Sequence, residues 1–299
     1  MEPLCPNMSR RFPDPRHRLP DAQWLERMYN NRLRVPAHAQ HAARWEAASR
    51  QARDALPCQL DLAYGEGAGQ VLDVFEAPRA AAPVVVFIHG GGWRGGSKAQ
   101  YGFVAAALRQ MGAAVVLPDY ARCPSLDVMQ ITLQMVQALA WTWRHAARFG
   151  GSARRIHVMG HGAGGQLAAM MLACAWPVFD PALPPRLVRG AMGLAGLYDL
   201  APLMHTPSIQ EALRLTPRQV QCASPARLPA PPSGRLLAVV GGDESGEYQR
   251  QTRLIQQAWG RARVPQALAL AGLNHFSLLD ALAQPGHRLN RLARELLRG

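Results

Sequence analysis

The chain has 299 residues, of which 48% are hydrophobic and 18% charged, so it is long enough to bury a substantial core and is neither disordered nor fibrous. Its net charge of +13 comes from scattered arginines and a single lysine, Lys98, a pattern that indicates compositional bias and no specific nucleic-acid partner. No apolar run approaches the roughly 20 residues of a membrane span, and residues 1–20 lack the apolar stretch of a secretory signal, so we expect a cytoplasmic protein without a membrane partner.

Residues 1–57 are expected to form a polar leader with helical stretches. Asp21 precedes apolar residues at helical spacing, as a capping residue does, and a second helix is expected over 41–55. Trp24, Tyr29 and Trp45 lie in this region, so we expect the leader to pack on the main body.

Residues 58–299 alternate short apolar runs with amphipathic patterns. The expected strands are 60–64, 71–75, 83–88, 113–117, 156–159, 190–197, 236–240 and 266–270, and the expected helices are 103–110, 125–149, 164–175, 247–261 and a last helix that ends near 297. This alternation predicts the α/β class, with a mostly parallel central sheet and helices on both faces. Residues 200–233 are rich in proline and predict a cap-like insertion over the sheet.

A glycine run follows the buried strand over 83–88. Residues 89–93 read HGGGW, and glycines at this point let backbone N–H groups turn toward one spot, where they stabilise a developing oxyanion. A plain glycine-rich turn is the alternative, but the position directly after a buried strand favours the functional interpretation. Trp93 borders this loop and is expected to contact an aromatic or short acyl substrate.

The strand over 156–159 is followed by the sequence GHGAGG at residues 160–165. This is the frame of a nucleophile elbow, G-x-S-x-G, in the strand–turn–helix context that the motif requires. The central residue is Gly162, however, so the nucleophilic hydroxyl is missing. Neither His161, whose side chain should point away from position 162, nor a serine of another loop replaces it.

Two further signals follow the last two strands. Glu244 and Asp243 come after the strand over 236–240, and either carboxylate could orient a histidine; we select Glu244 and keep Asp243 as the alternative. His275 follows the strand over 266–270, where it could act as a general base. The chain order of elbow, acid and histidine is that of the α/β-hydrolase fold.

Motifs along nearly the whole chain resemble the kynurenine formamidase (arylformamidase) and esterase branch of the α/β-hydrolases. The matching segments are 24–26 (WLE), 29–32 (YNNR), 72–75 (LDVF), 89–93 (HGGGW), 119–124 (DYARCP), 160–165 (GHGAGG), 197–200 (LYDL), 224–225 (SP), 242–245 (GDES) and 275–276 (HF). The resemblance implies hydrolysis of an ester or N-formyl amide substrate through an acyl-enzyme, with no cofactor and no metal. It implies that Glu244 is the acid, His275 the base, and the N–H groups of Gly91, Gly92 and Ala163 the oxyanion hole.

The family's serine falls on Gly162, and two interpretations follow. In the first, the protein is a hydrolase of this branch in which Gly162 is a recent or deliberate inactivating substitution. In the second, it is a natural pseudo-hydrolase that binds a ligand or a partner. The retained acid, histidine and glycine loop favour the first. The physiological substrate and a homodimeric state stay open.

Overall fold

The computed structural model describes residues 21–67 and 69–299. Its centre is an eight-stranded sheet in the order β1-β2-β4-β3-β5-β6-β7-β8. The strands are β1 (Cys58–Ala63), β2 (Val71–Phe75), β3 (Ala82–Ile88), β4 (Ala114–Pro118), β5 (Gly151–His161), β6 (Val188–Leu194), β7 (Leu236–Gly241) and β8 (Gln266–Leu270). β1 and β2 form an antiparallel hairpin, β2 is antiparallel to β4, and every other neighbouring pair is parallel. The predicted fold class is confirmed: this is an α/β-hydrolase fold.

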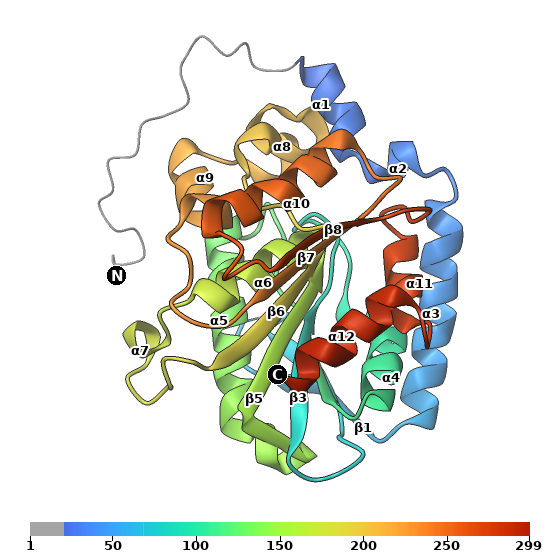
Figure 1. Cartoon of the computed structure of the whole chain (residues 1–299), viewed down its shortest axis with the longest axis vertical. Helices are drawn as coiled ribbons and strands as arrows, with labels where there is room; N and C mark the ends of the chain where they lie inside the picture. Colours follow the sequence, from blue (N-terminus) through green and yellow to red (C-terminus); the bar gives the residue numbers. More distant parts are fainter. Residues whose placement is uncertain (1–20, 68) are drawn as a thin grey trace.

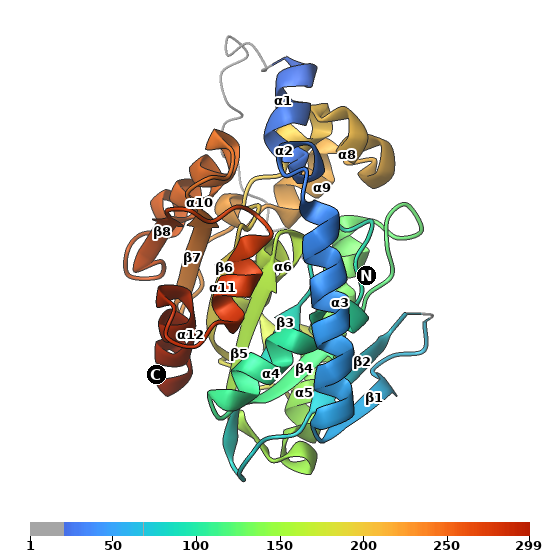
Figure 2. The same cartoon turned by 90° about the vertical axis from the view of Figure 1, so that its right-hand side faces the viewer.

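Helices cover both faces of the sheet (Figures 1 and 2). The α-helices are α1 (Ala22–Tyr29), α2 (Asn31–Arg34), α3 (His38–Ala55), α4 (Gly102–Gln110), α5 (Val128–His145), α6 (Ala163–Ala173), α7 (Trp176–Phe179), α8 (Pro207–Leu213), α9 (Pro217–Ala223), α10 (Gly246–Trp259), α11 (Ser277–Ala283) and α12 (Arg288–Arg298). Short 3₁₀ turns are η1 (Lys98–Tyr101), η2 (Ala146–Phe149), η3 (Ala201–His205) and η4 (Pro225–Arg227). Helices α3, α4, α11 and α12 lie on one face, and α5 and α6 on the other. None of the described helices is long and apolar enough to cross a membrane.

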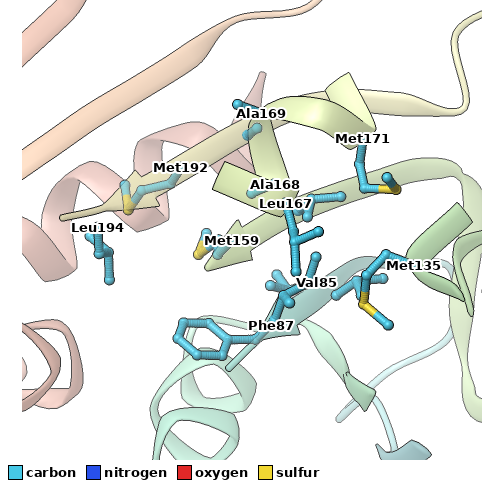
Figure 3. Close-up of a cluster of buried hydrophobic side chains, with 14 of the residues drawn as sticks. Val85, Phe87, Met135, Met159, Leu167, Ala168, Ala169, Met171, Met192 and Leu194 are labelled. Atoms are coloured by element: carbon cyan, nitrogen blue, oxygen red, sulfur yellow. The ribbon is translucent and has the colours of Figure 1, made fainter. Parts of the chain in front are cut away.

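The core lies on both faces of the central strands. Figure 3 shows part of it, with side chains from the strands β3, β5 and β6 and from the helices α5 and α6: Val85, Phe87, Met135, Met159, Leu167, Ala168, Ala169, Met171, Met192 and Leu194. All ten are at most 1% exposed. The fully apolar strand β3 is buried along its whole length because helices cover it on both faces.

The N-terminal helices join the body of the protein. Leu25, Tyr29 and Trp45 are buried in the same core as the sheet residues, and the predicted capping residue Asp21 accepts a hydrogen bond from the Trp24 N–H. Helix α1 contacts α8, η3 and α10, so it lies with the 200–233 segment at one end of the sheet (Figure 2). The expected cap-like segment therefore shares its position with part of the leader.

The expected last helix is interrupted. Helix α11 ends at Ala283 and α12 begins at Arg288, with Pro285 and Gly286 between them. A proline lacks the N–H of a continuing helix, and Gly286 has a φ of +80°, so the chain turns here.

Candidate active site

A sharp turn joins the central strand β5 to α6, and Gly162 occupies its corner. Gly162 has φ 54° and ψ −114°, a backbone conformation that L side chains adopt only with strain. Its N–H donates to the Leu194 carbonyl at 2.8 Å, which fixes the turn on the neighbouring strand. A Cβ at Gly164 would lie 2.0 Å from the Ile88 carbonyl oxygen, so the packing of α6 against β3 requires glycine there. The predicted elbow geometry is present.

His275 faces this corner. A Cβ built on Gly162 would lie 3.5 Å from both Nε2 and Cε1 of the His275 ring. On the other side of the ring, Nδ1 is 2.7 Å from Oε2 of Glu244. The structure therefore brings all three predicted positions together, in the order in which a nucleophile, a base and an orienting acid act.

Glu244, and not Asp243, is the carboxylate at His275. The Glu244 side chain is 1% exposed, and its second oxygen accepts the Gly241 N–H at 2.9 Å. Asp243, in contrast, is exposed to solvent. A buried carboxylate that accepts from Nδ1 holds the imidazole in the tautomer whose Nε2 is free to take a proton.

The glycine loop lies on the other side of the corner. Gly91 and Gly92 have φ values of 118° and 61°, and a Cβ at Gly91 would lie 2.1 Å from the Gly95 carbonyl oxygen. The Gly91 carbonyl accepts the N–H groups of Arg94 and Gly95, which closes the loop into a turn. Ala163 is the first residue of α6, where an N–H has no acceptor within its own helix. Gly91, Gly92 and Ala163 line the same cavity, as an oxyanion hole requires.

Trp93 borders the cavity, but its side chain is fully buried, with 0% of it exposed. Its indole N–H donates to Oε1 of Gln166 at 3.3 Å, and the Gln166 amide donates in turn to the Ala223 carbonyl. Trp93 therefore connects the glycine loop to α6 through a buried hydrogen bond. Contact between Trp93 and a substrate stays a prediction.

The cavity has a volume of about 490 Å³, which is in the usual range for small-molecule sites. Aromatic rings form much of its wall, and two of them approach His275: the ring centroid of Tyr248 is 5.2 Å away and that of Phe276 is 5.5 Å away. Other lining side chains come from the N-terminal helices and their connections: Tyr29, Asn30, Asn31, Arg32, His38 and Trp45. The sequence analysis placed no site residue in this segment.

His161 is a supporting residue that the sequence analysis set aside. Its Nε2 hydrogen-bonds the backbone carbonyl of His275 at 2.9 Å, and the centroids of the two rings lie 4.3 Å apart. Burial, with a smaller contribution from the nearby charge of His275, lowers the pKa of His161 well below its ordinary value, so the ring stays neutral. A neutral ring with its proton on Nε2 donates to that carbonyl and holds the loop that carries His275.

An ionic cluster around the buried side chains of Lys98 and Asp73 fixes the segment that follows the glycine loop. Lys98, the only lysine, places Nζ 2.5 Å from Asp73 and 2.6 Å from Asp61. Arg53 reaches the same Asp73 carboxylate at 3.2 Å and donates to the Lys98 carbonyl. The cluster connects α3, the β1–β2 hairpin and η1.

Comparisons with known proteins agree with the α/β-hydrolase fold. A family model described as alpha/beta hydrolase fold matches residues 85–230. Kynurenine formamidase of Danio rerio is 27% identical, over 86% of this chain and 88% of its own, and that of Salmo salar is 25% identical, over 92% and 93%. The crystal structure of a candidate thioesterase from Silicibacter sp. TM1040 superposes with a TM-score of 0.81 at 26% identity, over 92% of this chain and 99% of its own.

Proposed function

We infer that this chain, which belongs to the kynurenine formamidase and esterase branch of the α/β-hydrolases, has a site for small carboxylic esters or N-formyl amides. We also infer that Gly162 leaves the site without its covalent nucleophile, so that this chain is nearly inert. The kynurenine formamidase and esterase relatives support the substrate class at this coarse level.

One observation carries the proposal: the distance of 3.5 Å between a Cβ built on Gly162 and Nε2 of His275. A serine hydroxyl, one bond beyond that Cβ, would come within hydrogen-bond reach of Nε2, the relation that activates a serine nucleophile. No other side chain at the corner takes this position, since His161 is directed at the His275 backbone.

With serine present, the chemistry follows from the geometry. The hydroxyl oxygen attacks the substrate carbonyl while His275 Nε2 takes its proton, and Glu244 stabilises the imidazolium that forms. The carbonyl oxygen gains negative charge at the spot faced by the N–H groups of Gly91, Gly92 and Ala163. His275 then protonates the leaving alcohol or amine, and the same base activates water to release the acid from the acyl-enzyme.

With Gly162, the site keeps the base, the acid and the oxyanion hole but has no group that can form an acyl-enzyme. His275 can still activate a water molecule toward a carbonyl bound at the oxyanion hole. Loss of a triad serine costs about 10⁶-fold in kcat and leaves roughly 10³–10⁴-fold over the reaction in water. We therefore expect binding with very slow turnover.

A binding protein is the second candidate, and Gly162 itself favours it. Glycine relieves the strain at φ 54°, so the substitution that removes catalysis also suits the fold. The test compares this chain with Gly162→Ser on p-nitrophenyl acetate and N-formylkynurenine. Hydrolysis by the serine variant alone supports the hydrolase proposal. A serine variant that binds these compounds but hydrolyses neither supports a binding role.

A further inference from the structure

A second cavity, of about 650 Å³, lies at the opposite end of the sheet from the candidate active site. Its floor crosses four neighbouring parallel strands: His157 in the middle of β5 pairs with Gly190 near the start of β6, and Leu237 near the start of β7 pairs with Gln266, the first residue of β8. Helix α12 packs across β5 and β6, on the side of the molecule away from α1 and α8 (Figure 1). The cavity therefore opens between α12 and the beginnings of β6, β7 and β8.

Four arginines line this cavity. Arg186 and Arg189 lie at the start of β6, Arg235 directly precedes β7, and Arg263 lies shortly before β8. Glu295 of α12 is the one acidic side chain among the lining residues. Within residues 21–67 and 69–299, none of the four arginines comes within ion-pair distance of a carboxylate.

One of the four is fixed in place. The Arg263 guanidinium donates to the carbonyls of Pro231 and Pro232, so its position at the wall is set before any ligand arrives. Like charges gathered at one cavity repel one another, and an anion between them removes that cost. Guanidinium groups match phosphate and carboxylate oxygens with paired N–H donors.

His157 is a second, independent sign of a ligand. The residue is only 2% exposed, it lines the cavity, and its Nδ1 is buried without a hydrogen-bond partner. Burial, followed by the charges of Arg155 and Arg189, lowers the His157 pKa to about 4, so the ring is neutral at pH 7. In the tautomer with the proton on Nδ1, it offers an unused donor. Buried polar groups of this kind are ordinarily satisfied, so this one needs a partner.

The residue beside Nδ1 of His157 is Gly190. Gly190 has no side chain there, and a Cβ on it would lie 3.5 Å from Nδ1 of His157 and 2.8 Å from the tip of Leu296. Gln266 lines the cavity three strands away, on β8, and its buried side-chain oxygen also lacks a partner.

We propose that this cavity is a binding site for a small organic phosphate, whose anionic group is held by Arg189, Arg235 and the Nδ1–H of His157. The apolar body of the ligand would lie against Leu237 and Leu296, which line the same space. His157 precedes His161 by four residues on β5, roughly 13 Å along the strand, so one small ligand does not reach both this site and the Gly162 corner. The site is independent of the proposed hydrolase chemistry.

The test measures binding of pyrophosphate and of adenosine monophosphate to the whole chain by titration calorimetry at about 150 mM NaCl, where diffuse electrostatic attraction is largely screened. The double variant Arg189→Gln/Arg235→Gln is expected to raise Kd about tenfold or more, since each charge-assisted hydrogen bond contributes strongly. Arg253→Gln is the matched control: Arg253 is an exposed arginine of α10, away from the cavity. It should change Kd less than twofold.

Gly190→Ala provides a variant without a change of charge. The added methyl group narrows the floor beside Nδ1 of His157, so it should weaken binding severalfold, whereas diffuse attraction to arginines would be unaffected. Circular dichroism and melting temperature establish that each variant is folded. Three results would overturn the proposal: no binding at millimolar ligand, equal losses for the double variant and the Arg253 control, or binding of duplex DNA without binding of either phosphate compound.

Discussion

Restoring a hydroxyl at the β5–α6 corner tests the proposed chemistry most directly. Gly162→Ser adds a Cβ at 3.5 Å from Nε2 of His275, and its oxygen can then reach the hydrogen-bond range of roughly 2.6–3.2 Å. Loss of such a serine costs about 10⁶ in kcat, so its return should raise the rate by several orders of magnitude, up to about 8 kcal/mol of transition-state stabilisation. The same change should lower stability, because a side chain at φ 54° and ψ −114° costs about 1–3 kcal/mol.

The two effects have opposite signs and are measured separately. Hydrolysis of p-nitrophenyl acetate and N-formylkynurenine reports activity, and an organophosphonate reagent followed by mass spectrometry reports whether position 162 becomes labelled. Thermal melts should show a Tm about 2–5 °C below that of the parent chain. Gly162→Ala is the matched control, since it carries the same backbone strain without a hydroxyl. A serine variant that melts like the alanine variant, yet is neither labelled nor active, would refute the reasoning.

Three further outcomes follow from the buried polar groups. In the serine variant, Glu244→Gln should lower kcat by up to about 10⁴-fold because His275 loses its acceptor, whereas Asp243→Asn should change kcat less than twofold; steady-state kinetics decide this. Lys98→Met should cost roughly 1–3 kcal/mol in urea unfolding, since the buried Asp73 carboxylate loses its 2.5 Å partner and keeps only Arg53, at 3.2 Å, as a cation. Burial lowers the pKa of Lys98, but hydrogen bonds to Asp61 and Asp73 outweigh burial, so the pKa is raised overall. The difference in unfolding free energy between the parent and the Lys98→Met variant should therefore be constant below about pH 10.4 and shrink as the pH rises beyond it. The pKa of His157 is lowered to about 4, whereas an unfolded histidine titrates near 6.5. The folded protein should therefore lose up to about 3 kcal/mol of stability as the pH falls from about 6.5 to 4, because the unfolded state takes up the proton first. His157→Leu should abolish this loss, as measured by urea unfolding at each pH.

Local sequence signals predicted most elements because each signal has a local physical cause. Asp127 caps α5 through a reciprocal pair of hydrogen bonds with Gln130, and Gly150 ends the following turn in the left-handed conformation. Strand β5 was harder to delimit. It begins at Gly151, five residues before the apolar run at Ile156, because Gly151 pairs with Ala82 of β3. The residues between Gly151 and Ile156 are partly exposed, so their pairing with a distant strand gives no apolar pattern in the sequence.

Some residues of the candidate site could likewise be predicted from local sequence patterns, and others could not. Glycine spacing and chain order located the corner at Gly162, the glycine loop and His275, since each follows a predicted strand of the sheet. The choice between Glu244 and Asp243 rested on no local pattern. It depends on the turn after β7, in which the Glu244 carboxylate folds back onto the Gly241 N–H while Asp243 faces solvent.

The wall of the cavity lay beyond sequence reasoning because it is built from contacts between distant segments. Tyr29 of α1 donates to Glu247 of α10 at 2.6 Å. Arg94, beside the glycine loop, donates to the Ser208 carbonyl in the cap-like segment, and the Ser208 N–H donates to Glu26 of α1 at 3.0 Å. No periodicity encodes such polar contacts. The carboxyl ends of the strands thus position Gly162, Glu244 and His275, while α1 and the 200–233 segment contribute to the wall of the cavity. Changes in α1 should therefore alter which esters or amides fit, and leave the His275–Glu244 geometry intact.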